Sequence, residues 1–162
     1  MAEILEVSQM LADSYEPKKK NRWVMAINGI DSFTMKTASR PQITFEETTI
    51  EYINQKRYVA GKGTWAPVTL TLYDPIVPSA SQKVYEWIRL CWENLSGRMG
   101  YAQFYKKNIN LKLLDPVGAV VEDWELQGAW VQDANGGDLD YASSDVAEMA
   151  LTIRFDQCVL LF

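Results

Sequence analysis

The chain of 162 residues and 18.5 kDa has the size of one domain with short appendages. Its 48% hydrophobic and 23% charged residues exclude wholesale disorder and predict a sizeable core. The absence of histidine removes the commonest general base and metal ligand, and the two cysteines form neither a disulfide framework nor a zinc-binding spacing. Because it shows no signal-peptide pattern and no apolar stretch of about 18 residues, we expect a soluble protein of a reducing compartment, without membrane insertion.

The net charge of −5 is unevenly distributed. Residues 17–62 contain nine bases and four acids, a local +5, whereas residues 115–156 contain one base and ten acids, a local −9. The acidic total argues against phosphate binding, since neutralised phosphates drive affinity for nucleic acids. Composition alone favours two solvated faces of a monomer, and the split also permits head-to-tail association of a basic patch with the acidic patch of the next copy.

The first 16 residues are predicted to form a short helix. Ile4, Val7, Leu11 and Tyr15 recur near helical spacing, and Pro17 ends the pattern. We interpret the basic run that follows as a solvated strand entrance, because it is too short to indicate a nucleic-acid site.

A β-hairpin is predicted around Asn28-Gly29. Trp23, Met25 and Ile27 alternate with smaller residues before this dipeptide, and a second extended stretch follows it. Pro41 ends that stretch, because proline cannot donate a hydrogen bond to a β-ladder.

Residues 42–60 mix charge and β-propensity without clean alternation, so they have no consistent buried face. This is expected of an extended arm that leaves the domain, or of a mobile loop. The glycines of Gly61-Lys62-Gly63 are interpreted as the next turn.

A strand and a helix follow. Val68 to Tyr73 alternates strictly and predicts a half-buried strand. Ser79 or Ser81 is expected to cap a helix over residues 80–96. Apolar residues at helical spacing define its buried face: Val84, Trp87, Ile88, Cys91, Trp92 and Leu95. Gly97 closes it. On this face Cys91 is interpreted as a small core residue rather than a nucleophile.

The last third alternates persistently. Three strands are predicted, with these apolar faces: Ile109, Leu111 and Leu113; Trp124, Leu126 and Trp130; and Met149, Leu151, Ile153 and Phe155. Turns are expected at 115–118 and 135–137. Residues 1–162 are therefore predicted to form a single, mainly β domain of the α+β type. Its architecture would be an antiparallel β-sandwich or partly closed barrel with one amphipathic helix.

No constellation of catalytic residues is found. Nucleotide-binding glycine motifs are absent, and the adjacent acids Glu46-Glu47 and Glu122-Asp123 would point to opposite faces of a strand. Asp133, Asp138 and Asp140 lack the spacing of an EF-hand, so a solvated loop is favoured over a calcium site. We expect no enzyme activity, cofactor or metal.

The order of several segments nevertheless resembles a known family. In the first half these are Arg40-Pro41, Tyr58-Val59-Ala60-Gly61-Lys62, Val68 to Pro75 and the tryptophan-bearing helix. In the second half they are Asp115-Pro116, Glu122 to Trp130, Gly137 to Tyr141 and Leu151 to Asp156. Over roughly residues 15–156 the chain resembles the tail tube protein of contractile-tailed bacteriophages, to which the tube proteins of pyocins and type VI secretion are similar. The apolar Cys158–Phe162 segment departs from what that family leads one to expect.

The resemblance implies a structural virion protein of the tail tube. Six copies would form a ring, and stacked rings would form the hollow tube through which DNA leaves the capsid without specific binding. The implied partners are the sheath protein, the baseplate hub and the tape-measure protein, with assembly in the bacterial host cytoplasm.

Two sets of residues are expected to serve this assembly. The arm would reach an adjacent subunit or ring through Glu46, Glu47, Glu51, Tyr52, Lys56 and Arg57. The channel would be lined by some of Glu125, Gln127, Glu148 and Thr152, whose strand neighbours are apolar. The alternative is a monomeric small β-barrel that binds an apolar ligand, although the Trp87 helix is expected to fill its interior.

Overall fold

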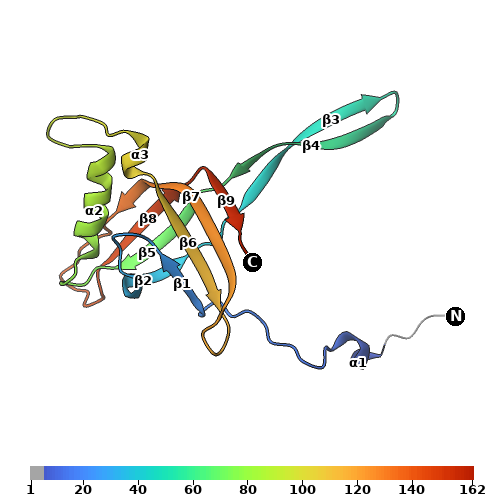
Figure 1. Cartoon of the computed structure of the whole chain (residues 1–162), viewed down its shortest axis with the longest axis horizontal. Helices are drawn as coiled ribbons and strands as arrows, with labels where there is room; N and C mark the ends of the chain where they lie inside the picture. Colours follow the sequence, from blue (N-terminus) through green and yellow to red (C-terminus); the bar gives the residue numbers. More distant parts are fainter. Residues whose placement is uncertain (1–5) are drawn as a thin grey trace.

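A computed structural model describes residues 6–162, which form a β-rich body, a long β-arm and an N-terminal segment (Figure 1). The strands are β1 Trp23–Ala26, β2 Met35–Ala38, β3 Ile43–Tyr52, β4 Gln55–Trp65, β5 Val68–Tyr73, β6 Lys107–Leu114, β7 Val120–Asn135, β8 Glu148–Arg154 and β9 Gln157–Leu160. The helices are α1 Val7–Met10, the 3₁₀ turn Ser32–Thr34, α2 Ala80–Cys91 and α3 Ala102–Tyr105.

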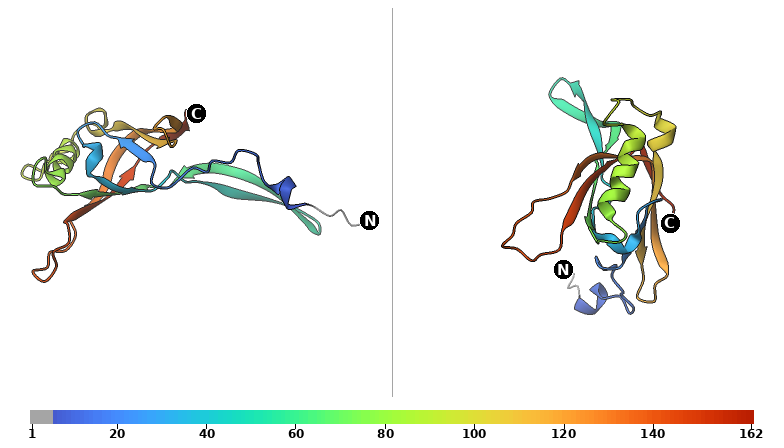
Figure 2. Two further views of the ribbon diagram at one scale, coloured as in Figure 1. Left: turned by 90° about the horizontal axis from the view of Figure 1, so that it is seen from below. Right: turned by 90° about the vertical axis from the view of Figure 1, so that its left-hand side faces the viewer.

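The body is a seven-stranded antiparallel sheet of order β1-β6-β7-β8-β5-β2, with β9 also paired to β7. It curls around its apolar face without closing into a barrel, and α2 lies across one end of the curl (Figure 2). Strict alternation positions the core: on β5, β6 and β8 the residues predicted to be apolar and inward are buried, with Leu72 and Ile109 fully so. The predicted fold class is confirmed.

The predicted hairpin at Asn28-Gly29 is wrong. Only Ile27 and Ile30 pair across this turn, and β1 and β2 lie at opposite ends of the strand order. After the turn a 3₁₀ segment redirects the chain: Thr34 is buried, and its hydroxyl donates to the Asp31 carbonyl at 2.7 Å. The short strand β1 therefore pairs with β6, and β2 pairs with β5.

Strand β7 does not keep the predicted face through Trp130, because it is bulged at Gly128. This glycine has φ 68°, and the β6–β7 register shifts beside it. Leu126 and Ala129 are both buried, whereas Trp130 turns toward Tyr105, with ring centroids 6.4 Å apart. On the edge of β7 opposite β6, residues before the bulge pair with β9 and residues after it pair with β8.

The C-terminal segment packs on its own domain. Cys158 lies opposite Leu126 on β7 and contacts the core, and the backbone of Asp123 exchanges hydrogen bonds with residues 161 and 162. The outer edge of β9 pairs with no other strand among residues 6–162.

Helix α2 begins as predicted. The Ser79 hydroxyl oxygen accepts a hydrogen bond from the Gln82 backbone N–H. The Asp74 carboxylate accepts from the backbone N–H and from the hydroxyl of Ser81. Val84 and Trp87 are buried, and Ile88 packs against the core beside them.

The helix ends at Cys91 rather than at residue 96, which corrects the prediction for Trp92 and Leu95. Trp92 is extended and 46% exposed, and Leu95 is 97% exposed. The chain folds back so that Gly100 donates to the Cys91 carbonyl at 2.9 Å. A Cβ on Gly100 would lie 2.1 Å from the Leu90 carbonyl oxygen, so this close return requires glycine.

The helix predicted for residues 1–16 is much shorter. Among residues 6–16 only Val7–Met10 is helical, and Ile4 lies outside the described residues. Val7, Leu11 and Tyr15 are each at least 70% exposed, so no tertiary packing extends the helix. Among residues 6–162 no helix combines the length and apolarity needed to cross a bilayer.

Candidate assembly surfaces

The predicted arm is a two-stranded hairpin that projects from the body (Figure 1). β3 has 10 residues and β4 has 11, so the arm reaches about 30 Å from its root. In the part of the chain that the structure describes, β3 and β4 pair only with each other, and the chain reverses at Ile53-Asn54. An isolated two-stranded hairpin is only marginally stable in water, so contacts with a partner would stabilise this arm.

The glycines interpreted as a turn lie inside β4 instead. A Cβ on Gly61 would lie 3.1 Å from the Glu46 backbone oxygen, and one on Gly63 would lie 3.0 Å from the Phe45 ring. The register shifts at this level, because Gly61 and Lys62 of β4 lie opposite the single residue Glu46 of β3, which makes a bulge on β4. The glycines therefore allow the close cross-strand approach that the bulge imposes.

The arm exposes apolar side chains as well as the predicted charged ones. Exposed large apolar residues on it are Ile43, Phe45, Ile50, Tyr52, Ile53, Tyr58 and Val59. Such a concentration on one projecting element marks an interaction surface.

The charged residues assigned to the arm are all solvent-exposed. Lys56 Nζ lies 3.5 Å from Glu51 Oε1, and Arg57 lies opposite Ile50 in the ladder. Glu46 and Glu47 form no ion pair within residues 6–162. The structure places these residues on an available surface, and their assembly role stays a prediction.

The arm root and the N-terminal segment are fastened to the body by Glu122. This residue is 4% exposed, and its carboxylate accepts from Lys18, from Arg40 Nη2 at 2.5 Å and from the Trp124 indole. Burial alone would raise the pKa of Glu122, but the hydrogen bonds from Lys18, Trp124 and Arg40 outweigh it and lower the pKa to about 2. The carboxylate is therefore ionised at every physiological pH.

The neighbouring Asp123 binds a different set of groups. Its carboxylate accepts from Asn110 Nδ2 at 3.1 Å and lies 4.0 Å from Lys112 Nζ. Strand alternation predicted that these two acids would point to opposite faces, and in the structure their carboxylates bind separate partners and form no dyad. Sequence reasoning missed the role of Glu122, because its cationic partners lie 104 and 82 residues away and leave no local pattern.

The four residues assigned to the channel wall lie on the face of the sheet that points away from the core. Glu125 and Gln127 follow each other on that face of β7, 3.3 Å apart between Nε2 and Oε2. Glu148 and Thr152 alternate with buried residues on β8, and Glu148 pairs with Lys36. All four are half-buried in the single chain, and their place in a channel stays a prediction.

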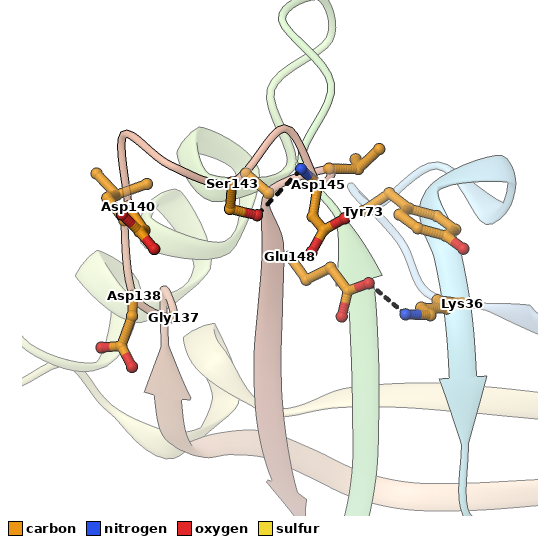
Figure 3. A pocket seen from close by; sticks show the side chains of 11 residues that line it. Lys36, Tyr73, Gly137, Asp138, Asp140, Ser143, Asp145 and Glu148 are labelled. Carbon is orange, nitrogen blue, oxygen red and sulfur yellow. Dashed lines mark hydrogen bonds and ion pairs between the residues drawn. The ribbon is translucent and has the colours of Figure 1, made fainter.

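The loop between β7 and β8 is acidic and partly apolar. Beneath it lies a pocket of about 730 Å³, bounded on the body side by Lys36, Tyr73 and Glu148 (Figure 3). Leu139 and Tyr141 are 91% and 111% exposed. Within residues 6–162 no three acidic or cysteine side chains gather in a metal-binding arrangement.

Comparison with known proteins identifies the family. The family model described as T4-like virus tail tube protein gp19 matches residues 19–158. The chain belongs to this family. It is therefore a tail tube structural protein, and the matched range includes the arm, the sheet and α2.

Solved structures share the fold of this tail tube protein. A cryo-EM structure of the anti-feeding prophage cap, the AFP tube terminating cap, has a TM-score of 0.76 at 18% identity and covers 96% of this chain and 98% of its own. The PVC sheath/tube terminator of an extracellular contractile injection system gives 0.75 at 17% identity, covering 93% and 100%. Hcp1 from Flavobacterium johnsoniae gives 0.53 at 11% identity, covering 86% and 94%. No curated protein matches the chain.

The interior packing of this tail tube protein tests the alternative of a monomeric β-barrel that binds an apolar ligand. The interior of the curl is filled by side chains such as Met25, Leu126, Val84 and Trp87, each no more than 3% exposed. Trp87 is held by an indole hydrogen bond to the Tyr105 carbonyl at 2.6 Å. This filling argues against a barrel that encloses an apolar ligand.

Proposed function

We propose that six copies of the chain form a ring, and that stacked rings form the hollow inner tail tube through which DNA leaves the virion. The observation that carries the proposal is the family match over residues 19–158. The fold likeness to a chain of the PVC sheath-tube complex, with a TM-score of 0.71 at 16% identity over 97% of this chain and 98% of that one, supports it.

The open edges of the sheet support ring formation. β1 and β2 end the strand order, and the outer edge of β9 carries no further strand of residues 6–162. Unpaired edges invite pairing with other chains, and adjacent copies that complete one another's sheets would close a continuous inner wall. Size-exclusion chromatography with light scattering tests this: we expect rings of six chain masses or larger polymers. A particle of one chain mass, 18.5 kDa, is the result expected of the monomeric alternative.

The arm would carry contacts to the neighbouring subunit or ring. Its exposed apolar side chains would be buried there, and Glu46, Glu47, Glu51, Lys56 and Arg57 would fix its register by charge pairing. The double variant Glu46→Lys/Glu47→Lys should abolish or greatly reduce tubes in electron micrographs. Its unfolding midpoint should stay that of the wild type, since both side chains are exposed. Unchanged tube formation would remove the arm from the proposal.

The channel wall would be built from the polar face of the sheet. Glu125, Gln127, Glu148 and Thr152 lie on this face, and acidic groups there would repel DNA phosphates, so that DNA slides without sticking. Tubes of the variant Glu125→Lys should retain added DNA at low salt, whereas wild-type tubes should release it. A ring structure with these four side chains on the outer wall would refute the assignment.

The remaining partners follow from a tube of this kind. We infer contacts with the sheath protein, the baseplate hub and the tape-measure protein, and assembly in the bacterial host cytoplasm. The role is structural, without a catalytic step or a cofactor. Co-purification of the chain with these proteins from assembled particles tests the partner set.

A further inference from the structure

A basic pocket lies at the end of the body from which the N-terminal segment and the arm depart. Its volume is about 370 Å³, and its apolar wall contains Trp23, Leu111 and Leu113. Four cationic side chains surround this wall: Lys18, Lys19, Lys20 and Arg40. The pocket thus combines an apolar surface with a positively charged rim.

The charge of this rim is not balanced within the chain. Glu122 is a single carboxylate that binds both Lys18 and Arg40. Lys19 and Lys20 are exposed and have no ion-pair partner in the part of the chain that the structure describes. The rim therefore keeps an excess of positive charge directed at whatever enters the pocket.

A segment of matching chemistry lies at the other end of the body. The loop between β7 and β8 projects from the end that carries α2, opposite the departure of the arm and the N-terminal segment (Figures 1 and 2). Its sequence Asp138-Leu139-Asp140-Tyr141 alternates acidic and large apolar residues. Leu139 and Tyr141 are almost wholly exposed, and neither aspartate forms an ion pair within residues 6–162.

We propose that residues 138–141 of one copy dock in this basic pocket of the next copy. Leu139 and Tyr141 would pack against the wall of Trp23, Leu111 and Leu113. Asp138 and Asp140 would pair with Lys19 and Lys20. This contact rests on the proposed tube function and names one of its subunit interfaces.

The positions of the two surfaces suit repeated association. Because they lie at opposite ends of one chain, the contact is heterologous: each copy offers its loop to one neighbour and its pocket to another. Such a contact propagates into a closed ring or a stacked filament. Two basic pockets repel each other, and so do two acidic loops, so pocket-to-pocket and loop-to-loop pairing is disfavoured.

Charge reversal and its rescue test the contact. The variants are Lys19→Glu/Lys20→Glu in the pocket, Asp138→Lys/Asp140→Lys in the loop, and all four changes combined. The concentration needed for assembly is measured by sedimentation at low salt. We expect each double variant to raise it at least about tenfold. The variant with all four changes should return toward the wild-type concentration. A variant with a misfolded loop or pocket would show no such return.

A matched control reverses two exposed cations elsewhere. Arg89→Glu/Arg98→Glu makes the same change in net charge on α2 and the turn after it, and it should leave the loop–pocket contact intact. Raising the salt concentration should weaken assembly of the wild type, because the pairs lie at an exposed rim.

The outcomes separate this contact from the tube proposal. Wild-type tubes together with normal assembly of both double variants would overturn the contact and leave the tube. A quadruple variant that does not regain assembly, while the wild type forms tubes, would likewise overturn the contact and leave the tube. Charge-dependent oligomers without hollow tubes would uphold the contact and overturn the tube. A wild type that stays monomeric at all concentrations would overturn both.

Discussion

Replacing Glu122 by glutamine keeps the size of the side chain but removes a buried negative charge that two cations share. Glu122 is 4% exposed and accepts from Lys18, Arg40 and Trp124. Its pKa of about 2, against an ordinary 4.5, corresponds to about 3 kcal/mol of stabilisation at neutral pH. Because the Lys18 and Arg40 side chains stay 52% and 58% exposed, solvent screens the pairs, and we expect a loss nearer about 2 kcal/mol.

The pH dependence of this loss distinguishes charge from packing. The folded-state pKa lies below the ordinary value, so the carboxylate stabilises the fold above pH 4.5 and loses this contribution as the pH falls through about 2. Urea unfolding of the wild type and Glu122→Gln should differ by about 2 kcal/mol at pH 7 and converge near pH 2.

The matched control is Glu125→Gln, three residues along the same strand and half-buried on its outer face. We expect that control to change the unfolding free energy by no more than about 0.5 kcal/mol. A Glu122→Gln difference that stayed constant from pH 7 to pH 2 would refute the account of Glu122 as a charge clamp.

Three further predictions concern the body. Trp87→Phe removes the indole donor to the Tyr105 carbonyl and should cost about 1–3 kcal/mol in urea unfolding; an unchanged midpoint would contradict the hydrogen bond. Gly128→Ala places a side chain at φ 68° and should lower the melting temperature by several degrees, whereas the control Gly136→Ala, where a Cβ meets open space, should not. Burial raises the pKa of Cys158 to about 11, so in a Cys91→Ser background this thiol should react with a disulfide reagent at pH 8 about a hundredfold more slowly than an ordinary thiol; reaction at the rate of the unfolded chain would contradict this.

Alternation made the body of the fold predictable, and long-range pairing limited the rest. Val68 to Tyr73 and Met149 to Phe155 show their buried faces directly in sequence, and the structure confirms both. The Asn28-Gly29 dipeptide has the local pattern of a hairpin, but β6 and β5 offer longer apolar partners than β1 and β2 offer each other. Local propensity is overridden there by tertiary pairing.

The end of α2 and the Gly128 bulge were missed for a related reason. Trp92 and Leu95 continue the helical spacing, yet the return of Gly100 onto the Leu90 carbonyl ends the helix first. Trp130 continues the spacing of Trp124, but the extra bulge residue turns it to the other side. Both depend on a close backbone contact that no periodicity reports.

The candidate surfaces were predictable only in part. The absence of a consistent buried face allowed either an extended arm or a mobile loop, and the structure shows a hairpin arm that no other strand of residues 6–162 covers. Sequence alone could not show that Glu122 joins Lys18 to Arg40, nor that the basic pocket and the acidic loop lie at opposite ends of the body, because these relations arise only from the folded topology.

Electron micrographs of the concentrated, purified chain test the central claim most directly. The account predicts hollow tubes of uniform diameter with a six-fold ring repeat, formed without any other protein. Fields that contain only single particles of one chain mass, at every protein and salt concentration tried, would contradict it.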